Sequence, residues 1–176
     1  MPPKGTLTTD GEYATLEFER VYRHPPELVW DAISTPEGLK NWLLCSFANI
    51  EGRAGGAIEL ISGPARYHST GKILKWQPPL LLEYEWNVAP VPEMPRGERA
   101  VFRYELTPHP DGTALRVTYS RISRETARGF RPGLHAFLDR LEAQLARQPL
   151  PDWLERFATH RSEYPDWSHD AAEPGQ

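Results

Sequence analysis

This 176-residue chain has a single cysteine, no long apolar run and no excess of positive charge. Because Cys45 is the single cysteine, no disulfide can form within the chain, which fits a reducing compartment. The longest apolar runs, such as Leu80–Leu82, are far shorter than the roughly 20 residues that span a bilayer. The first five residues contain no apolar segment of a secretory signal. We therefore expect a soluble, cytoplasmic protein without a membrane span.

Binding to nucleic acid is disfavoured, because the formal net charge is −4 and the Lys and Arg residues are scattered. Motifs that carry chemistry are also absent. The segment Gly52–Gly56 has neither the phosphate-binding nor the dinucleotide-binding spacing, and there is no Gly-x-Ser-x-Gly elbow. No two histidines lie four residues apart, so no zinc-type spacing exists and we interpret them as incidental surface residues: His24, His68, His109, His135, His160 and His169. We predict no metal site and no cofactor.

Proline and aromatic residues are plentiful instead. The 18 prolines cluster between candidate elements, and the chain contains 6 Trp, 7 Tyr and 6 Phe. So many rings in a chain of this length indicate either a thick core or the lining of an apolar pocket.

Alternating apolar residues predict a strand over 13–22, followed by two short helices. Pro26 and Pro36 suit the first turn of these helices, and Thr35 is a candidate N-cap for the second. We expect Trp30 and Trp42 to anchor the two helices on the sheet rather than to contact a ligand. Further strands are predicted over 57–61, 66–76, 80–86, 99–107 and after the Asp111-Gly112 turn.

Helical spacing of apolar residues then predicts a long helix over Arg131–Arg147 with Leu134, Leu138 and Leu141 buried. We place its start near Arg131 because proline at 132 fits a first turn. Strands followed by one long helix indicate an α+β fold with an antiparallel sheet. After Pro149, Trp153, Leu154 and Phe157 share a face that we expect to pack on the domain or on a second copy, and residues after 165 look disordered.

The stretch from His24 to Trp42 resembles the opening of the SRPBCC (START-like) superfamily, most closely the branch of activator of heat-shock-protein-90 ATPase homologue-like proteins. Gly55-Gly56, Gly71-Lys72-Ile73-Leu74, Pro78-Pro79 and Asp111-Gly112-Thr113 follow in the order typical of that branch. The resemblance covers about 12–147. It implies a helix-grip fold, a curved antiparallel sheet around a long C-terminal helix with two short helices after the first strand. We expect one domain over 1–176, with 148–176 as an extension.

The superfamily includes lipid carriers, hormone receptors, cyclases, ring-hydroxylase subunits and co-chaperone domains, so the fold alone does not give the function. The co-chaperones that gave the branch its name carry a further N-terminal domain with an Asn- and Trp-rich motif. Nothing in this sequence resembles that domain, which argues against direct chaperone activation.

The candidate site is a cavity between sheet and helix, of a few hundred cubic ångströms. We predict that its ligand-binding residues are Phe18, Arg20, Tyr84, Trp86, Tyr104, Tyr119, Phe130, Leu134 and Phe137. Arg20 is the unusual member, because strand alternation points its guanidinium inward, where it needs a carboxylate or an anionic ligand. Pairing with Glu83 or Glu105 is one interpretation, and contact with an acidic ligand is the other.

We predict a non-catalytic protein that binds a small hydrophobic or aromatic molecule. The alternatives are an enzyme of cyclase or hydrolase type, in which Arg20 and cavity tyrosines polarise a carbonyl, and a co-chaperone or protein-interaction module. A homodimer or a protein partner could use the C-terminal extension. No catalytic residue can be named, because the sequence offers no clear candidate for a base with a shifted pKa.

Overall fold

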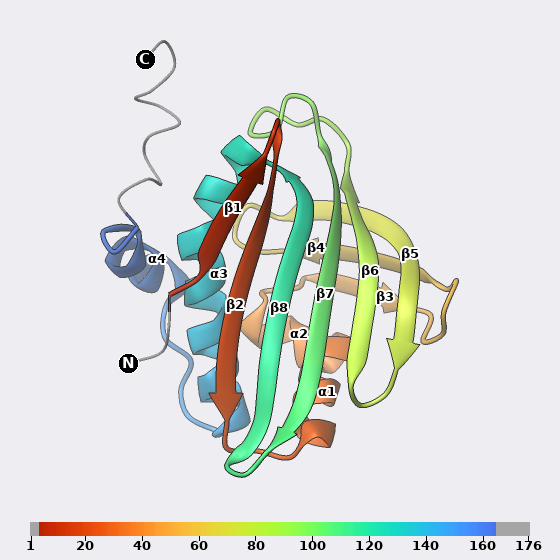
Figure 1. Ribbon diagram of the computed structural model, residues 1–176, viewed down its shortest axis with the longest axis vertical. Helices are drawn as coiled ribbons and strands as arrows, with labels where there is room; N and C mark the ends of the chain where they lie inside the picture. Colours follow the sequence, from red (N-terminus) through yellow and green to blue (C-terminus); the bar gives the residue numbers. More distant parts are fainter. Residues whose placement is uncertain (1–3, 165–176) are drawn as a thin grey trace.

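The computed structural model describes residues 4–164, which form an eight-stranded antiparallel sheet and four helices (Figure 1). The strand order across the sheet is β1-β2-β8-β7-β6-β5-β4-β3. The strands are β1 (Thr6–Asp10), β2 (Tyr13–Tyr22), β3 (Phe47–Ile50), β4 (Ala57–Ser62), β5 (Tyr67–Gln77), β6 (Leu81–Val88), β7 (Glu98–His109) and β8 (Gly112–Ser123). The helices are α1 (Pro26–Ser34), α2 (Pro36–Trp42), α3 (Arg124–Leu145) and α4 (Trp153–Arg161).

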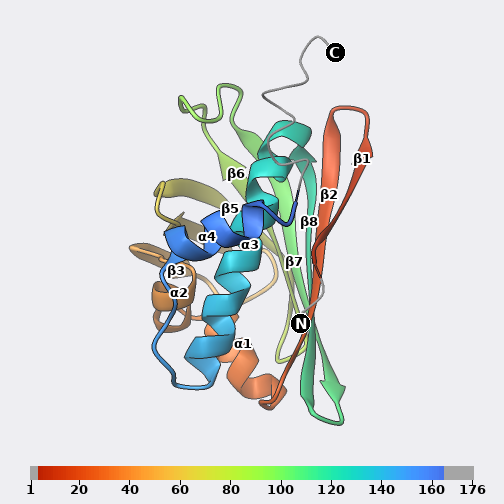
Figure 2. The ribbon, with the colours of Figure 1, turned by 90° about the vertical axis from the view of Figure 1, so that its left-hand side faces the viewer.

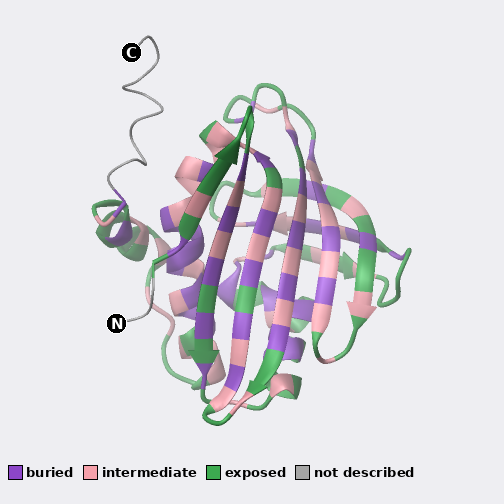
Figure 3. Cartoon of the chain, viewed as in Figure 1, coloured by how far each residue is buried: buried purple, intermediate pink, exposed green. Residues whose placement is uncertain are grey.

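The sheet curves around α3, which lies along one of its faces (Figure 2). The central strands alternate between buried and less buried residues, as Figure 3 shows along β2, β8, β7 and β6. The register sets rings side by side on the inner face, where Tyr84 is paired with Phe102 and Phe102 with Tyr119. This is the predicted helix-grip architecture, with both short helices after β2.

Two edge strands were not predicted. The residues of β1 are nearly all exposed, and β3 has only four residues. Neither segment carries a run of buried alternating residues, so only pairing with β2 and β4 makes them strands. Leu80, predicted to be in a strand, precedes β6 and is 44% exposed because it lies in the turn.

The short helices behave as their sequences indicate. Proline occupies the first turn of each, and the Thr35 hydroxyl accepts a hydrogen bond of 3.0 Å from the Gly38 amide. Trp42 is fully buried, and its indole N–H donates to the Ala32 carbonyl at 2.8 Å. Trp30 is buried edge-on against Trp76. The prediction that both indoles are structural anchors is confirmed.

Helix α3 begins at Arg124, seven residues before the predicted start, so Pro132 lies inside it. The earlier start is explained by Glu98, whose buried carboxylate accepts hydrogen bonds from the Ser123 amide and hydroxyl and from the Thr126 hydroxyl. These bonds fix the first turn, where helix amides lack partners within the helix. The predicted burial of Leu134, Leu138 and Leu141 is confirmed.

Helix α4 packs back on α3. The Trp153 indole N–H donates to the Gly133 carbonyl at 3.2 Å, and the absence of a Cβ at Gly133 allows the ring to approach this closely. Leu154, expected on the same packed face, is 64% exposed. None of the helices within residues 4–164 is long and apolar enough to cross a membrane. The prediction of disorder after 165 lies outside the described residues.

Candidate functional site

A cavity of about 320 Å³ lies between the sheet and the first half of α3. The sheet contributes Leu60, Tyr84, Trp86, Phe102 and Tyr119 to its wall, and α3 contributes Phe130, Leu134 and Phe137. The β4–β5 turn, the first residue of β5, the β6–β7 loop and α4 close its sides with residues that include Pro64, Tyr67, Glu93, Met94, Trp153 and Phe157. The wall is therefore aromatic on both the sheet side and the helix side.

Six of the nine residues predicted for the site meet around this cavity: Tyr84, Trp86, Tyr119, Phe130, Leu134 and Phe137. Phe18, Arg20 and Tyr104 are not among its lining residues. Phe18 lies beneath α3 with its ring edge-on to His135, at a centroid distance of 5.8 Å. Tyr104 is fully buried behind Tyr119, and the two hydroxyl oxygens are 3.0 Å apart.

The placement of Arg20 corrects the expectation of a charged group at the cavity. Its guanidinium is buried, donates to the Glu19 carbonyl at 2.8 Å and lies 5.3 Å from the centre of the Phe18 ring. It lines a separate hollow of about 600 Å³ with Tyr22 and with Glu142 of α3. The reason is position both across and along the sheet, since Arg20 lies on β2 near the sheet edge and is paired with Leu115, four residues along β8 from the Tyr119 that lines the cavity.

The two carboxylates considered as partners for Arg20 are bound elsewhere. Glu83 and Glu105 each contact the Arg103 guanidinium at 3.0 Å. Glu83 is the cross-strand partner of Arg103 in the β6–β7 pair, whereas Glu105 lies two residues along β7 from Arg103 and therefore on the same face of that strand. Strand alternation alone does not reveal that Arg103, rather than Arg20, is the partner of Glu83 and Glu105.

The buried tyrosines Tyr84, Tyr104 and Tyr119 form a group of neighbouring hydroxyls with raised pKa values. Burial raises the pKa of Tyr104 to about 12, against the lowering effect of hydrogen bonds from Tyr119 and Tyr84. Burial also raises the pKa values of Tyr84 and Tyr119 well above the ordinary value. The thiol of Cys45 lies close enough to interact with them, and burial raises its pKa to about 12. These groups are therefore protonated at neutral pH and can donate or accept hydrogen bonds but not abstract protons.

Sequence reasoning missed the cavity residues that come from loops and from α4. Pro64, Glu93 and Trp153 lie in segments whose path depends on the tertiary fold. Phe102, by contrast, alternates in register with Tyr104, and its ring stacks on Tyr119 with a centroid distance of 3.5 Å. Strand parity could have identified it.

A second cluster of titratable groups joins α3 to the end of the described chain. The ligand atoms of His135, His160 and Glu163 lie within 4.8 Å of one another. The two imidazoles are buried and stacked, with centroids 3.6 Å apart, so the interpretation of these two as surface histidines was wrong. Stacked, nearly parallel rings direct their nitrogen lone pairs side by side rather than toward one point, which does not suit a shared metal ion.

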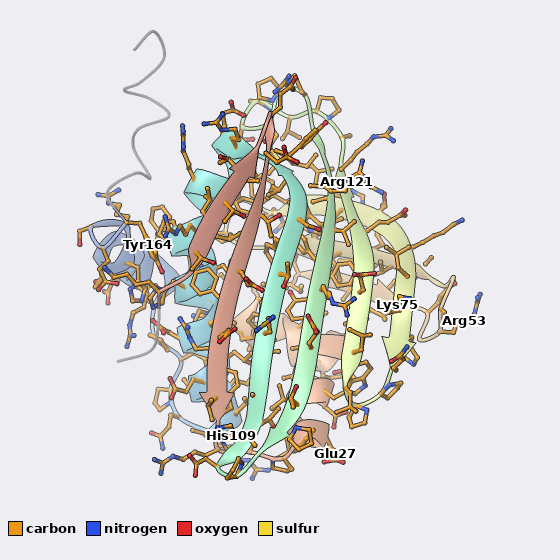
Figure 4. All side chains as sticks on the ribbon, viewed as in Figure 1. Glu27, Arg53, Lys75, His109, Arg121 and Tyr164 are labelled. Carbon is orange, nitrogen blue, oxygen red and sulfur yellow. The ribbon has the colours of Figure 1, made fainter. Side chains whose placement is uncertain are left out.

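Three of the four imidazole nitrogens of this cluster have hydrogen-bonding partners among the described residues. His160 contacts Asp139 at 2.6 Å through Nε2 and Glu163 at 3.1 Å through Nδ1. His135 Nδ1 contacts the Tyr164 hydroxyl at 2.7 Å, and Figure 4 shows Tyr164 beside α3 near α4. The Tyr164 hydroxyl also accepts a hydrogen bond from the Gly5 amide. We interpret the cluster as structural: its hydrogen bonds hold α3, α4 and the start of the described chain together.

Comparison with protein families assigns the chain to one of them. Residues 23–146 match the family described as activator of Hsp90 ATPase homolog 1-like protein. The chain belongs to this family. No curated protein matches the sequence.

Solved structures agree with this assignment. The protein MLL2253 from Mesorhizobium loti is 30% identical, with a TM-score of 0.67 over 77% of this chain and 99% of that one. CalU16 from Micromonospora echinospora is 20% identical, with a TM-score of 0.68 over 94% of this chain and 95% of that one. A Bordetella parapertussis protein, BPP1335, is 23% identical, with a TM-score of 0.67 over 93% of this chain and 90% of that one. The last two similarities show the fold alone.

Proposed function

We propose that this protein binds a small apolar or aromatic molecule in the cavity between the sheet and α3, without converting it chemically. One observation carries the proposal: an opening of about 320 Å³ remains in a part of the interior that is walled by aromatic rings. Such a volume is at the lower end of the range for small-molecule sites. Protein interiors are otherwise close-packed, so an opening of this size calls for an explanation.

The chemistry of the wall supports binding over catalysis. The Tyr119 hydroxyl and other polar tips can orient a ligand by hydrogen bonds. An enzyme of cyclase or hydrolase type would need a group that exchanges protons near neutral pH. The raised pKa values of Tyr84, Tyr104, Tyr119 and Cys45 argue against such a role for these residues.

Gly129 offers a direct test, because it lines the cavity and a Cβ built on it meets nothing within 4 Å. Gly129→Phe should place a ring in the opening, whereas Gly129→Ala adds only a methyl group and serves as the matched control. Both changes remove a glycine from a helix interior, so neither should destabilise α3. The wild-type protein and Gly129→Ala should bind the neutral fluorescent probe N-phenyl-1-naphthylamine and retain any co-purified small molecule in native mass spectrometry. Gly129→Phe should neither bind the probe nor retain a co-purified molecule.

Equal probe binding by all three proteins would show that the probe does not use this cavity. Absence of probe binding and of a co-purified molecule from the wild-type protein would reject the proposal. Circular dichroism of each variant checks that the fold is retained.

A further inference from the structure

The side chains that line the cavity carry charge of one sign only. Glu93 and Glu125 are the charged residues of the wall, and no Lys, Arg or His within residues 4–164 belongs to it. Both glutamates are exposed, and within that range neither makes an ion pair. A ligand that enters here therefore meets two carboxylates and no compensating cation.

The two glutamates approach the cavity from different elements at the same end of the molecule. Glu93 lies in the β6–β7 loop and Glu125 in the first turn of α3, and Figure 2 shows both segments at the end where α3 begins. The pKa of Tyr67, another lining residue, is raised by burial and then by the charge of Glu93. The carboxylate is therefore within electrostatic range of the Tyr67 hydroxyl.

The start of a helix attracts negative charge, which offers another reason for an acidic residue at position 125. Here that role is already filled. The carboxylate of Glu98 is buried at the start of α3, where it accepts hydrogen bonds from the Ser123 amide and hydroxyl and from the Thr126 hydroxyl. Glu93 and Glu125 therefore bring two further carboxylates to the wall at this end of the cavity, where no lining side chain within residues 4–164 is cationic.

Three aromatic rings of the same wall lie close together. The ring centroids of Tyr67, Trp86 and Phe130 are separated by 6.2, 5.8 and 5.6 Å. The face of an aromatic ring carries the negative part of its quadrupole and attracts a desolvated cation. A cationic group that reaches the face of one of these lining rings would thus be attracted by the ring as well as by the carboxylates of Glu93 and Glu125.

We propose that the cavity selects an organic cation: a molecule with an apolar, preferably aromatic, body that fits between the rings and one amine or ammonium group held near Glu93 and Glu125. This inference rests on the proposed function, since it specifies the ligand of the same cavity. It differs from the acidic ligand that was one of the two interpretations of Arg20, because Arg20 lies outside the wall. A carboxylate ligand would add a third negative charge beside the two glutamates.

Three probes with the same ring and different charge test the inference: 1-naphthylmethylamine as the cation, 1-naphthalenemethanol as the neutral compound and 1-naphthoic acid as the anion. Calorimetric Kd values are measured near neutral pH at low and high salt. For the wild-type protein we expect the amine to bind at least about fivefold more tightly than the alcohol, and the acid to bind most weakly. High salt should reduce this preference, because the glutamates are exposed.

The variant with Glu93→Gln and Glu125→Gln together should bring the amine-to-alcohol ratio close to one while leaving the affinity for the alcohol unchanged. Glu37→Gln is the matched control, since Glu37 is also an exposed acidic residue in the first turn of a helix, α2, but lies outside the wall. It should preserve the preference. Binding of the alcohol without a preference for the amine, or a preference that survives in the double variant, would overturn the cation inference and leave the proposed function standing. If none of the three probes binds, both the cation inference and the proposed function are rejected.

Discussion

Leu141 and His135 lie on the same helix and are both buried, but burial has opposite consequences for them. For an aliphatic side chain, removal from water is favourable and close packing adds dispersion contacts. For an imidazole, removal from water disfavours the charged form and makes stability depend on pH. Each residue therefore gives its own test of the structure.

We expect Leu141→Ala to lower the free energy of unfolding by about 2–5 kcal/mol. Leu141 is 0% exposed, so the substitution leaves a void between α3 and the sheet. Leu154→Ala is the control, because Leu154 is 64% exposed and its loss should change stability by less than about 0.5 kcal/mol. Urea titrations with unchanged slope measure both. Similar effects for the two substitutions would contradict the placement of α3.

His135 should make the protein less stable in acid. Burial and then the neighbouring His160 lower the pKa of His135 from 6.5 to about 4. Between these values the unfolded chain binds a proton that the folded protein does not, so stability is full above about pH 6.5 and falls toward about pH 4. We expect His135→Asn to lose less stability than the wild-type protein between about pH 7 and about pH 5.

The matched control for this pH test is His24→Asn, because His24 lies outside the cluster of His135, His160 and Glu163. It should follow the wild-type curve over the same range. Parallel curves for all three proteins would show that His135 does not contribute to the acid sensitivity.

At the scale of elements, α4 covers α3 and also closes one side of the cavity. Trp153 bonds to the Gly133 carbonyl, and its ring lies 5.4 Å from that of Phe137 and 4.9 Å from that of Phe157. Tyr164, which follows α4, is 1% exposed and bonds to both His135 and Gly5. The segment after Pro149 therefore belongs to the packed structure as far as Tyr164, where the described residues end.

Truncation after Gln148 should destabilise the protein by several kcal/mol and promote self-association, because it uncovers the part of α3 around Gly133 and Phe137 on which Trp153 and Phe157 pack. A chain that ends at Tyr164 keeps α4 and serves as the control, which should behave as the full chain does. Urea titration and light scattering report the two effects. If truncation after Gln148 left stability and apparent mass unchanged, α4 would have no structural role.

For the whole molecule, we expect one cooperative unfolding transition. The eight strands form one continuous hydrogen-bonded sheet, and α3 packs against strands of that sheet. Differential scanning calorimetry should therefore give a calorimetric enthalpy equal to the van't Hoff enthalpy. Two resolved transitions would argue against the single domain expected from the sequence. A co-purified ligand must be removed before the measurement, because a ligand that binds only the folded state raises Tm.

The sequence by itself determined the order and kind of most elements. Residues 13–22 alternate and form β2, proline in the first turn predicted α1 and α2, and the spacing of Leu134, Leu138 and Leu141 predicted the buried face of α3. These features depend on local periodicity and on backbone preferences, which neighbouring residues decide. Where a signal was weak, as in β1 and β3, the strand exists only because a neighbour offers hydrogen bonds.

Only the tertiary structure decided which inward-facing residues meet. Phe18, Arg20 and Tyr84 all point to the same face of the sheet, yet Tyr84 lines the cavity whereas Arg20 lines a different hollow and Phe18 packs under α3. Strand alternation fixes the face to which a side chain points but not its position across the sheet. That position follows from strand order and curvature. The charge of the cavity depends on the same long-range geometry, because Glu93 comes from a loop and Glu125 from a helical turn that the sequence pattern assigned to no element.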